Sequence, residues 1–377
     1  MEVKLTDDQE FFRQTTARFL AAEVPPSAIR ALTDHPDGYE PAYWRQGAEL
    51  GWTSLLVPEE HGGGTVSGSG VVELTIVADA FGRHTAPGPL IPTNVAAATI
   101  ARSGTDEQRA EHLAPIIAGE IVAAWCFEEP PPVEVLDGAT VRATSDGDGF
   151  VLSGVKAPVE AAAQADLLLV TARTDDGLTQ LLVPRDSEGV TVTPLHSIDL
   201  VRRFGRVELD GVRVPASAVV GAVGGAEADV EHQLQLALVM QAAEMVGAAE
   251  KTFDFTLEWA FDRYSFGRPL ASYQELKHRF ADMKMWLEAS HALTSALARE
   301  IQEEARWVPE TASAAKAYIG DHLAELVQDC VQIHGGIGLT SDHDIHLYLR
   351  RVTADRSTYG RPADHRQRIA ALATTAA

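Results

Sequence analysis

The sequence predicts an α+β fold in three parts: a helical N-terminal domain, a β-rich middle domain and a C-terminal four-helix bundle. Apolar residues recur at helical spacing up to about residue 116, and again in long stretches from residue 226 onward. Between these regions, short runs of β-forming residues are separated by Gly and Asp turns. We therefore place the domain boundaries at 1–118, 119–225 and 226–377.

The N-terminal region opens with a signal for the start of a helix. Thr6 and Gln9 have the spacing of a capping box, and Phe12 and Phe19 follow at helical spacing. Further helices are expected over 70–81 and 93–102. The pattern predicts a helical domain that is interrupted at Gly- and Pro-rich points.

Five short runs in the middle region predict strands. Each contains apolar or β-branched residues and is bounded by Gly, Asp or Pro. These runs cover 121–127, 150–152, 167–171, 179–183 and 189–194. Together they predict a β-barrel-like domain of about 100 residues.

Helical spacing returns in the C-terminal region. Long helices are expected over 232–261, 274–304 and 313–333. Because the links between them are short, neighbouring helices should run antiparallel, as in a four-helix bundle.

Composition excludes several classes of function. The chain has 31 Lys and Arg against 54 Asp and Glu, a net charge of -23. Such a balance argues against nucleic-acid and membrane-surface binding, which need basic patches. No apolar run reaches membrane-spanning length. Cys126 and Cys330 form neither a disulfide framework nor a metal-ligand pattern, so a reducing cytoplasm is expected.

Two C-terminal segments predict a ligand site. The first runs from Arg263 through Phe266 to Pro269, with Gln274 a few residues on. An Arg at a helix end can form forked contacts to a diphosphate, and an aromatic ring offers a flat face to an adenine. The second segment contains Gly335 and Gly336, which let the backbone approach a ligand closely.

With these segments the chain resembles the acyl-CoA dehydrogenase family. Members carry R-x-x-F-G, a Gln in the next helix, and Q-x-x-G-G-x-G, which match 263–267, Gln274 and 332–338 here. The helical–β–helical order also matches, and 57–63 resembles an N-terminal signature of the family. The resemblance covers nearly the whole chain.

The resemblance implies an FAD cofactor and an acyl-CoA substrate. In the family, these motifs hold the ADP half of an FAD whose flavin lies mainly in the neighbouring subunit, so an oligomer is expected. An electron-transfer flavoprotein is the expected electron acceptor. The implied cofactor-binding residues are Arg263, Ser265, Phe266, Gln274, Gln332, Gly335 and Gly336.

The family reaction needs a carboxylate that removes the α-proton of the thioester. Aligned without a gap from Arg350, the usual position of this base is Tyr359, whose reference pKa of about 10 makes it a poor base. A second family position falls near Ala237. Members that resemble bacterial steroid side-chain dehydrogenases carry a Glu farther along that helix, and Glu244 matches it.

The surroundings of Glu244 allow two interpretations. It is the only formally charged residue between His232 and Ala249, which makes it a candidate catalytic base. Alternatively, it forms a solvated stripe with Gln241 and Lys251 at helical spacing.

Segments that face the flavin in the family are altered in this chain. Glu128 replaces a hydroxyl residue, while Pro158 and Glu160 replace a Trp and a Thr. Two carboxylates near a reduced flavin are electrostatically unfavourable. These changes resemble one kind of subunit in bacterial α2β2 enzymes for steroid-derived or other bulky acyl-CoAs, which lends its motifs to its partner's FAD.

Three functions therefore remain open. The chain is a catalytic acyl-CoA dehydrogenase with Glu244 as its base, alone or with a homologous partner. Or it is a non-catalytic subunit that completes the FAD site of that partner. A third possibility keeps the fold but performs flavin oxidase or monooxygenase chemistry. No metal site is expected, because His343 and His346 lack a third ligand.

Overall fold

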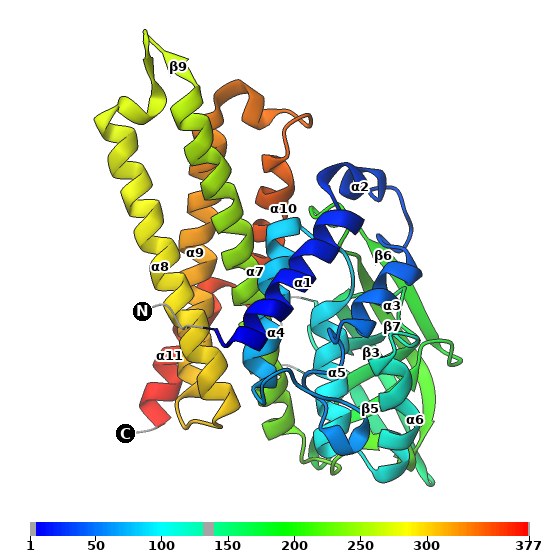
Figure 1. The fold of residues 1–377 in the computed structure, drawn as a ribbon. Helices are drawn as coiled ribbons and strands as arrows, with labels where there is room; N and C mark the ends of the chain where they lie inside the picture. The colour runs from blue at the N-terminus through cyan, green and yellow to red at the C-terminus, as the bar shows by residue number, and fades with distance from the viewer. Residues whose placement is uncertain (1–4, 131–138, 376–377) are drawn as a thin grey trace.

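We describe a computed structural model that covers residues 5–130 and 139–375 (Figure 1). The predicted order of a helical part, a β part and a second helical part is confirmed. The helices of the first part are α1 (Asp7–Glu23), α2 (Pro26–Ala31), α3 (Pro41–Glu49), α4 (Gly70–His84), α5 (Leu90–Ser103) and α6 (Asp106–Ile117).

The predicted capping box opens α1. The Thr6 hydroxyl accepts a hydrogen bond from the Gln9 backbone N–H at 3.2 Å, and the Gln9 side chain accepts one from the Thr6 N–H at 3.1 Å. A second capping box, formed by Thr105 and Gln108, opens α6. The α6 helix was not predicted separately, although its capping signal is of the same kind.

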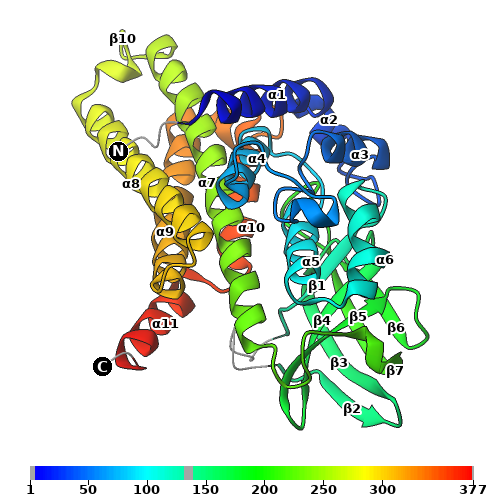
Figure 2. The same ribbon diagram turned by 60° about the horizontal axis from the view of Figure 1, so that its bottom comes forward.

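The middle part is one eight-stranded sheet. Its strands are β1 (Ala123–Cys126), β2 (Arg142–Asp146), β3 (Gly149–Glu160), β4 (Leu167–Thr174), β5 (Gly177–Pro184), β6 (Val190–Leu195), β7 (Phe204–Pro215) and β8 (Val219–Val220). They lie in the order β6-β7-β3-β2-β4-β5-β8, and β1 pairs with β4 in parallel. Figure 2 shows α5 and α6 packed over this sheet, with the long C-terminal helices beside them.

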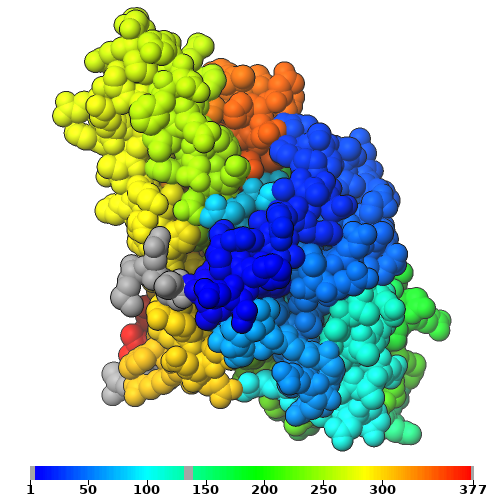
Figure 3. All heavy atoms as spheres, in the orientation of Figure 1, coloured from blue at the N-terminus to red at the C-terminus, as the bar shows by residue number. Residues whose placement is uncertain are grey.

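The C-terminal part is a bundle of long helices. They are α7 (Glu227–Asp262), α8 (Gln274–Gln302), α9 (Val308–His334), α10 (Ile345–Ser357) and α11 (Pro362–Thr375). A short hairpin of β9 (Tyr264–Ser265) and β10 (Arg268–Pro269) joins α7 to α8. In the space-filling view the hairpin end stands clear of the N-terminal helices (Figure 3).

Two glycines bring α4 against α7 at the level of Glu244. A Cβ on Gly82 would lie 1.9 Å from the Glu244 carbonyl oxygen, and one on Gly247 would lie 2.1 Å from the Asp79 carbonyl oxygen. No larger residue fits at either position without separating the helices. This close crossing fixes the stretch of α7 that carries Glu244.

Loops separate the helical, β and helical parts of the chain. α6 ends at Ile117 and β1 begins at Ala123, while α7 begins at Glu227. Across the described residues, no helix is both long and apolar enough to cross a membrane.

Candidate functional site

The R-x-x-F-G segment forms a projecting hairpin at the free end of the bundle (Figure 1). Arg263 caps α7 in an extended conformation, and β9 pairs with β10 directly after it. The turn between the strands places Phe266 at a φ of 49° with 98% of the residue exposed. Within the described chain, Arg263 has no acidic group at ion-pair distance. Its guanidinium is therefore open to a ligand from outside the chain.

The second motif lies beside the hairpin at the same end. Gln274 is the first residue of α8 and Gln332 lies in the last turn of α9, and both are exposed. Gly335 has φ 66° and ψ -140°, a conformation that essentially only glycine adopts. A Cβ on Gly335 or Gly336 would meet no atom within 4 Å. With the half-buried Ser265, all seven predicted cofactor residues gather at one end of the bundle.

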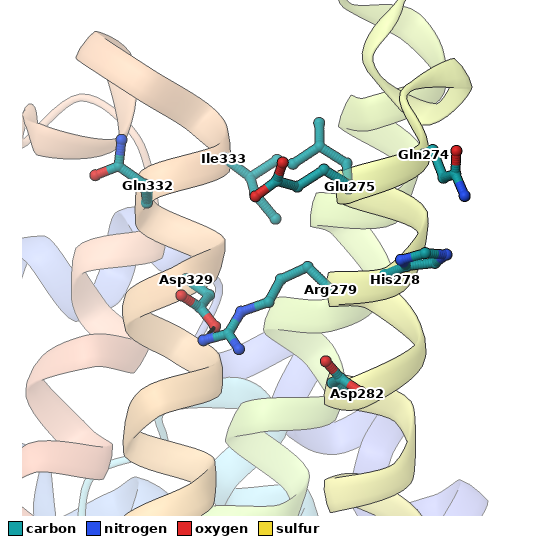
Figure 4. Close-up of a pocket in the computed structure, with 9 residues that line it drawn as sticks. Gln274, Glu275, His278, Arg279, Asp282, Asp329, Gln332 and Ile333 are labelled. Carbon is teal, nitrogen blue, oxygen red and sulfur yellow. Dashed lines mark ion pairs between the residues drawn. The ribbon is translucent and has the colours of Figure 1, made fainter.

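A cleft of about 650 Å³ lies between the start of α8 and the end of α9 (Figure 4). Gln274 and Gln332 both line it, together with His278 and Arg279. The Arg279 guanidinium forms ion pairs with Asp329 and, at 2.9 Å, with Glu325. Arg279 is thus neutralised inside the chain, in contrast to Arg263.

The bundle end fits the ADP half of an FAD. An unpaired, exposed guanidinium suits a diphosphate, and the open backbone at Gly335 and Gly336 admits close approach of a ligand. The exposed Phe266 ring offers a stacking face. All of these groups face outward, so a ligand held by them alone would remain largely in water.

Glu244 lies in the interior of the molecule, only 1% exposed. Its Oε2 atom accepts a hydrogen bond from Arg202 Nη2 at 2.7 Å, and its Oε1 atom accepts one from Arg351 Nη1 at 2.5 Å. Both carboxylate oxygens are therefore engaged by guanidinium groups. The interpretation of Glu244 as part of a solvated stripe is wrong, because helices α4, α7 and α10 and the loop before β7 enclose it.

Arg202 is the hub of this buried cluster. It lies in the loop between β6 and β7 and forms ion pairs with three carboxylates. Its Nε atom lies 3.0 Å from Glu160, its Nη2 atom pairs with Glu244, and its Nη1 atom pairs with Asp355. Burial raises the pKa of Glu160, although Arg202 opposes this shift. Burial and the charge of Glu244 raise the pKa of Asp355.

Arg351 forms the second branch of the cluster. Its Nε atom lies 2.5 Å from Asp199 Oδ2, and it also donates to the carbonyl oxygens of Thr85 and Ala86. Burial alone would raise the pKa of Asp199, but Arg351 and the Arg202 backbone N–H lower it to about 2. The cluster thereby joins the N-terminal helices, the middle sheet and the bundle.

Around Glu128, side chains from β1, β3 and the segment after α10 contact one another. Glu129 pairs with Lys156 at 2.7 Å. The Trp125 and Phe127 rings stack with centroids 4.6 Å apart, and the Tyr359 ring lies 5.5 Å from that of Trp125. These polar groups and rings are thus occupied by one another rather than presented to a ligand.

Tyr359, at the usual position of the base, is tied into the same region. Its backbone N–H donates to Glu128 Oε1 at 2.9 Å, and its hydroxyl lies 3.4 Å from Glu160 Oε2. Burial raises the pKa of Glu128 to about 7, against the opposing effect of Lys316. Lys316 donates to the carbonyl oxygens of Asp355 and Thr358, which holds the segment before Tyr359 in place.

Sequence reasoning missed Arg202, Arg351, Asp199, Asp355 and Lys316. Arg202 and Arg351 lie 42 and 107 positions from Glu244, so no local spacing connects them. The only local signal was the Arg202–Arg203 pair between Leu200–Val201 and Phe204, and it does not distinguish the buried Arg202 from its neighbour. Among the described residues, no group of three potential ligands could hold a metal ion.

Comparison with known proteins identifies the family of each part. The acyl-CoA dehydrogenase N-terminal domain matches residues 6–120, the middle domain 133–212 and the C-terminal domain 225–373. The chain is 28% identical over 371 residues to acyl-CoA dehydrogenase IpdE2 of Mycolicibacterium smegmatis, covering 97% of this chain and 99% of that protein.

Solved structures agree over almost the full length. A Tcur3481–Tcur3483 steroid ACAD variant superimposes with a TM-score of 0.90 at 28% identity, covering 98% of each chain. The ChsE4–ChsE5 complex from Mycobacterium tuberculosis gives a TM-score of 0.89 at 25% identity, covering 99% of each chain.

Proposed function

This chain belongs to the acyl-CoA dehydrogenase family of FAD-dependent oxidoreductases, and from that premise we propose that it is one subunit of a heteromeric acyl-CoA dehydrogenase. In the assembly, its bundle end completes the FAD site of a homologous partner. Bound FAD supplies the hydride acceptor for α,β-dehydrogenation of the acyl-CoA thioester. The residues that would hold its ADP half are Arg263, Ser265, Phe266, Gln274, Gln332, Gly335 and Gly336.

The observation that carries this proposal is the outward position of the seven predicted residues. Arg263 has no internal acidic partner, and the Gly335–Gly336 backbone is open. A dinucleotide held here needs a second chain to cover it. Two similar solved structures are described by pairs of chains, Tcur3481–Tcur3483 and ChsE4–ChsE5, which supports a heteromer over a homo-oligomer.

We propose further that this chain contributes ADP-binding residues to the FAD site of its partner but does not catalyse the reaction in its own interior. Glu244 is held by Arg202 and Arg351, so it would have to exchange two charge-assisted hydrogen bonds for the substrate proton. Glu128 and Glu160 bring further carboxylate groups to the positions that face the flavin in relatives.

A catalytic role for Glu244 is the second candidate. It is favoured by the burial of this carboxylate in an apolar helix, where a base is shielded from water. In that case, Glu244→Gln would abolish turnover in the oligomers that still assemble and bind flavin.

The substrate class is part of the same proposal. A bulky acyl-CoA of steroid type is supported by the similarity to a structure described as a steroid ACAD. An electron-transfer flavoprotein is the proposed electron acceptor.

The direct test is the flavin content of the chain with and without a homologous partner subunit. We expect little FAD in the chain alone and about one FAD per pair of chains after co-expression. Stoichiometric FAD in the chain alone, with turnover that Glu244→Gln removes, would replace this proposal with the second candidate.

A further inference from the structure

A column of stacked rings connects the two motif segments at the bundle end. The His334 ring stacks on Trp259, with centroids 5.3 Å apart and planes inclined by 15°. The Arg263 guanidinium lies over the Trp259 ring, 5.7 Å from its centroid. The His343 ring lies 4.5 Å from His334. None of these three aromatic residues was assigned a role above.

Two members of the column, His334 and Trp259, lie close to motif residues in the chain. His334 is the last residue of α9, and Gly335 follows it. Trp259 lies one turn before Arg263, so the two side chains share a face at the end of α7. The stack therefore joins the last turn of one motif-bearing helix to the last turn of the other.

The His334 ring is fixed from several sides. The residue is 5% exposed, and its Nδ1 atom lies 2.9 Å from the Cys330 carbonyl oxygen. Burial lowers the pKa of His334, opposed by this hydrogen bond and reinforced by His343. Burial thus disfavours the charged form of the ring, which packs against Trp259 as a flat face.

We propose that His334 and Trp259 are positioning residues of the dinucleotide site. Their stack sets the distance and orientation of Arg263 relative to the Gly335–Gly336 backbone, so both contact the same ADP group together. The inference rests on the proposed function, because it presumes that this end of the bundle binds the ADP half of FAD. It adds two residues that do not themselves touch the cofactor.

The test is the dissociation constant of FAD for the assembled oligomer, measured by flavin fluorescence after removal of the cofactor. A stacked aromatic pair changes an equilibrium by about three- to tenfold, so His334→Ala should weaken binding by about that factor. His334→Phe retains a flat ring and should restore binding to within about twofold. The control, His346→Ala, changes a histidine of the same region that hydrogen bonds to the Ser341 carbonyl and lies outside the column.

Trp259→Leu probes the other member of the stack. It should weaken FAD binding by a similar factor, and the double variant with His334→Ala should add little, because both remove one interaction. Thermal unfolding of each oligomer separates a binding defect from a folding defect. If His334→Ala does not assemble, Trp259→Leu and His334→Phe still decide the matter.

Two outcomes would overturn the positioning role. One is FAD binding unchanged in both His334→Ala and Trp259→Leu, and the other is His334→Phe binding as weakly as His334→Ala. An Arg263→Ala variant distinguishes a failure of the proposed function from a failure of the positioning role alone. If it also binds FAD normally, the proposed function fails; if it alone weakens binding, only the positioning role fails.

Discussion

Glu244 is the single carboxylate in an apolar stretch of α7, and guanidinium groups from two other regions hold both of its oxygens. Removing one member of a buried ion pair leaves the other charges uncompensated, which costs about 3–5 kcal/mol. We expect Glu244→Ala to lower the free energy of unfolding by about that amount in urea titrations.

The matched control is Glu288→Ala, which removes the exposed partner of Lys284, 2.8 Å away. An exposed pair of this kind contributes less than about 1 kcal/mol. Equal effects of the two substitutions would contradict the account of the buried cluster.

Glu128 makes the stability of the fold depend on pH, and the direction of that dependence follows from its raised pKa. Burial raises its pKa from 4.5 to about 7, so the folded chain binds this proton more tightly than the unfolded chain does. The stability from this group is present below about pH 4.5 and is lost as the pH rises towards about 7. Glu128→Gln should therefore gain stability relative to the wild type across that window.

The measurement is the thermal midpoint of both proteins at several pH values within the window. The control is Glu303→Gln, at the exposed residue that caps the end of α8. Its thermal midpoint should change with pH in the same way as that of the wild type. A constant difference between Glu128→Gln and wild type at all pH values would show that Glu128 is not the titrating group.

At the scale of secondary-structure elements, the two glycines in the turn after α9 have different expected roles. Gly335 is needed for the backbone conformation, and Gly336 for contact with the ligand. Gly335 has positive φ, so Gly335→Ala should destabilise the fold by about 1–3 kcal/mol. Gly336 has no such constraint, and Gly336→Ala should leave unfolding unchanged while weakening FAD binding through the added methyl group. Unfolding in denaturant and FAD titration of both variants check this. Normal FAD binding by Gly336→Ala would remove this turn from the site.

Patterns that lie within one segment of the sequence, such as a capping box or helical spacing, correctly predicted the helix formed by that segment. The capping box at Thr6, the helix over 70–81 and the long C-terminal helices are confirmed, with ends displaced by a few residues. β7 was missed although Val207 and Leu209, and then Val212 and Val214, alternate with charged residues, because the alternation changes phase at Asp210–Gly211, where the pairing with β3 shifts register. Pairing between distant strands leaves no fixed spacing in the sequence.

The outward-facing and the buried parts of the candidate site also differ in how far the sequence predicted them. The outward residues, such as Arg263 and Gly335, belong to contiguous motifs, and the structure places them together. The buried cluster around Glu244 is assembled from four separate regions, so the sequence could identify one lone carboxylate but not the two guanidinium groups that hold it.

At the scale of the whole molecule, the bundle end carries exposed apolar side chains beside the half-site. Phe266, Leu339 and Tyr264 are 98%, 82% and 64% exposed. Exposed apolar clusters are typical of interaction surfaces, and the proposed partner subunit would cover this one. We expect amide hydrogen exchange over 263–274 and 332–340 to slow when the partner and FAD are added.

The turn between β2 and β3, at 146–149, is the internal reference for that measurement. It lies at the opposite end of the molecule from the β9–β10 hairpin (Figure 2), so its exchange should not change. Slowed exchange at this reference turn alone would place the partner on a different face of the molecule.

The central claim is that the Arg263 guanidinium binds a dinucleotide shared between two chains. Flavin absorbance per oligomer, compared between Arg263→Ala and Arg268→Ala, tests it most directly. Arg268 lies in the same hairpin, but its guanidinium is held 3.8 Å from the Tyr273 ring centroid, closer than the 5.7 Å between the Arg263 guanidinium and the Trp259 ring. The account predicts that Arg263→Ala loses most of the bound flavin while Arg268→Ala retains it. Equal flavin content in the two assembled variants would contradict the account.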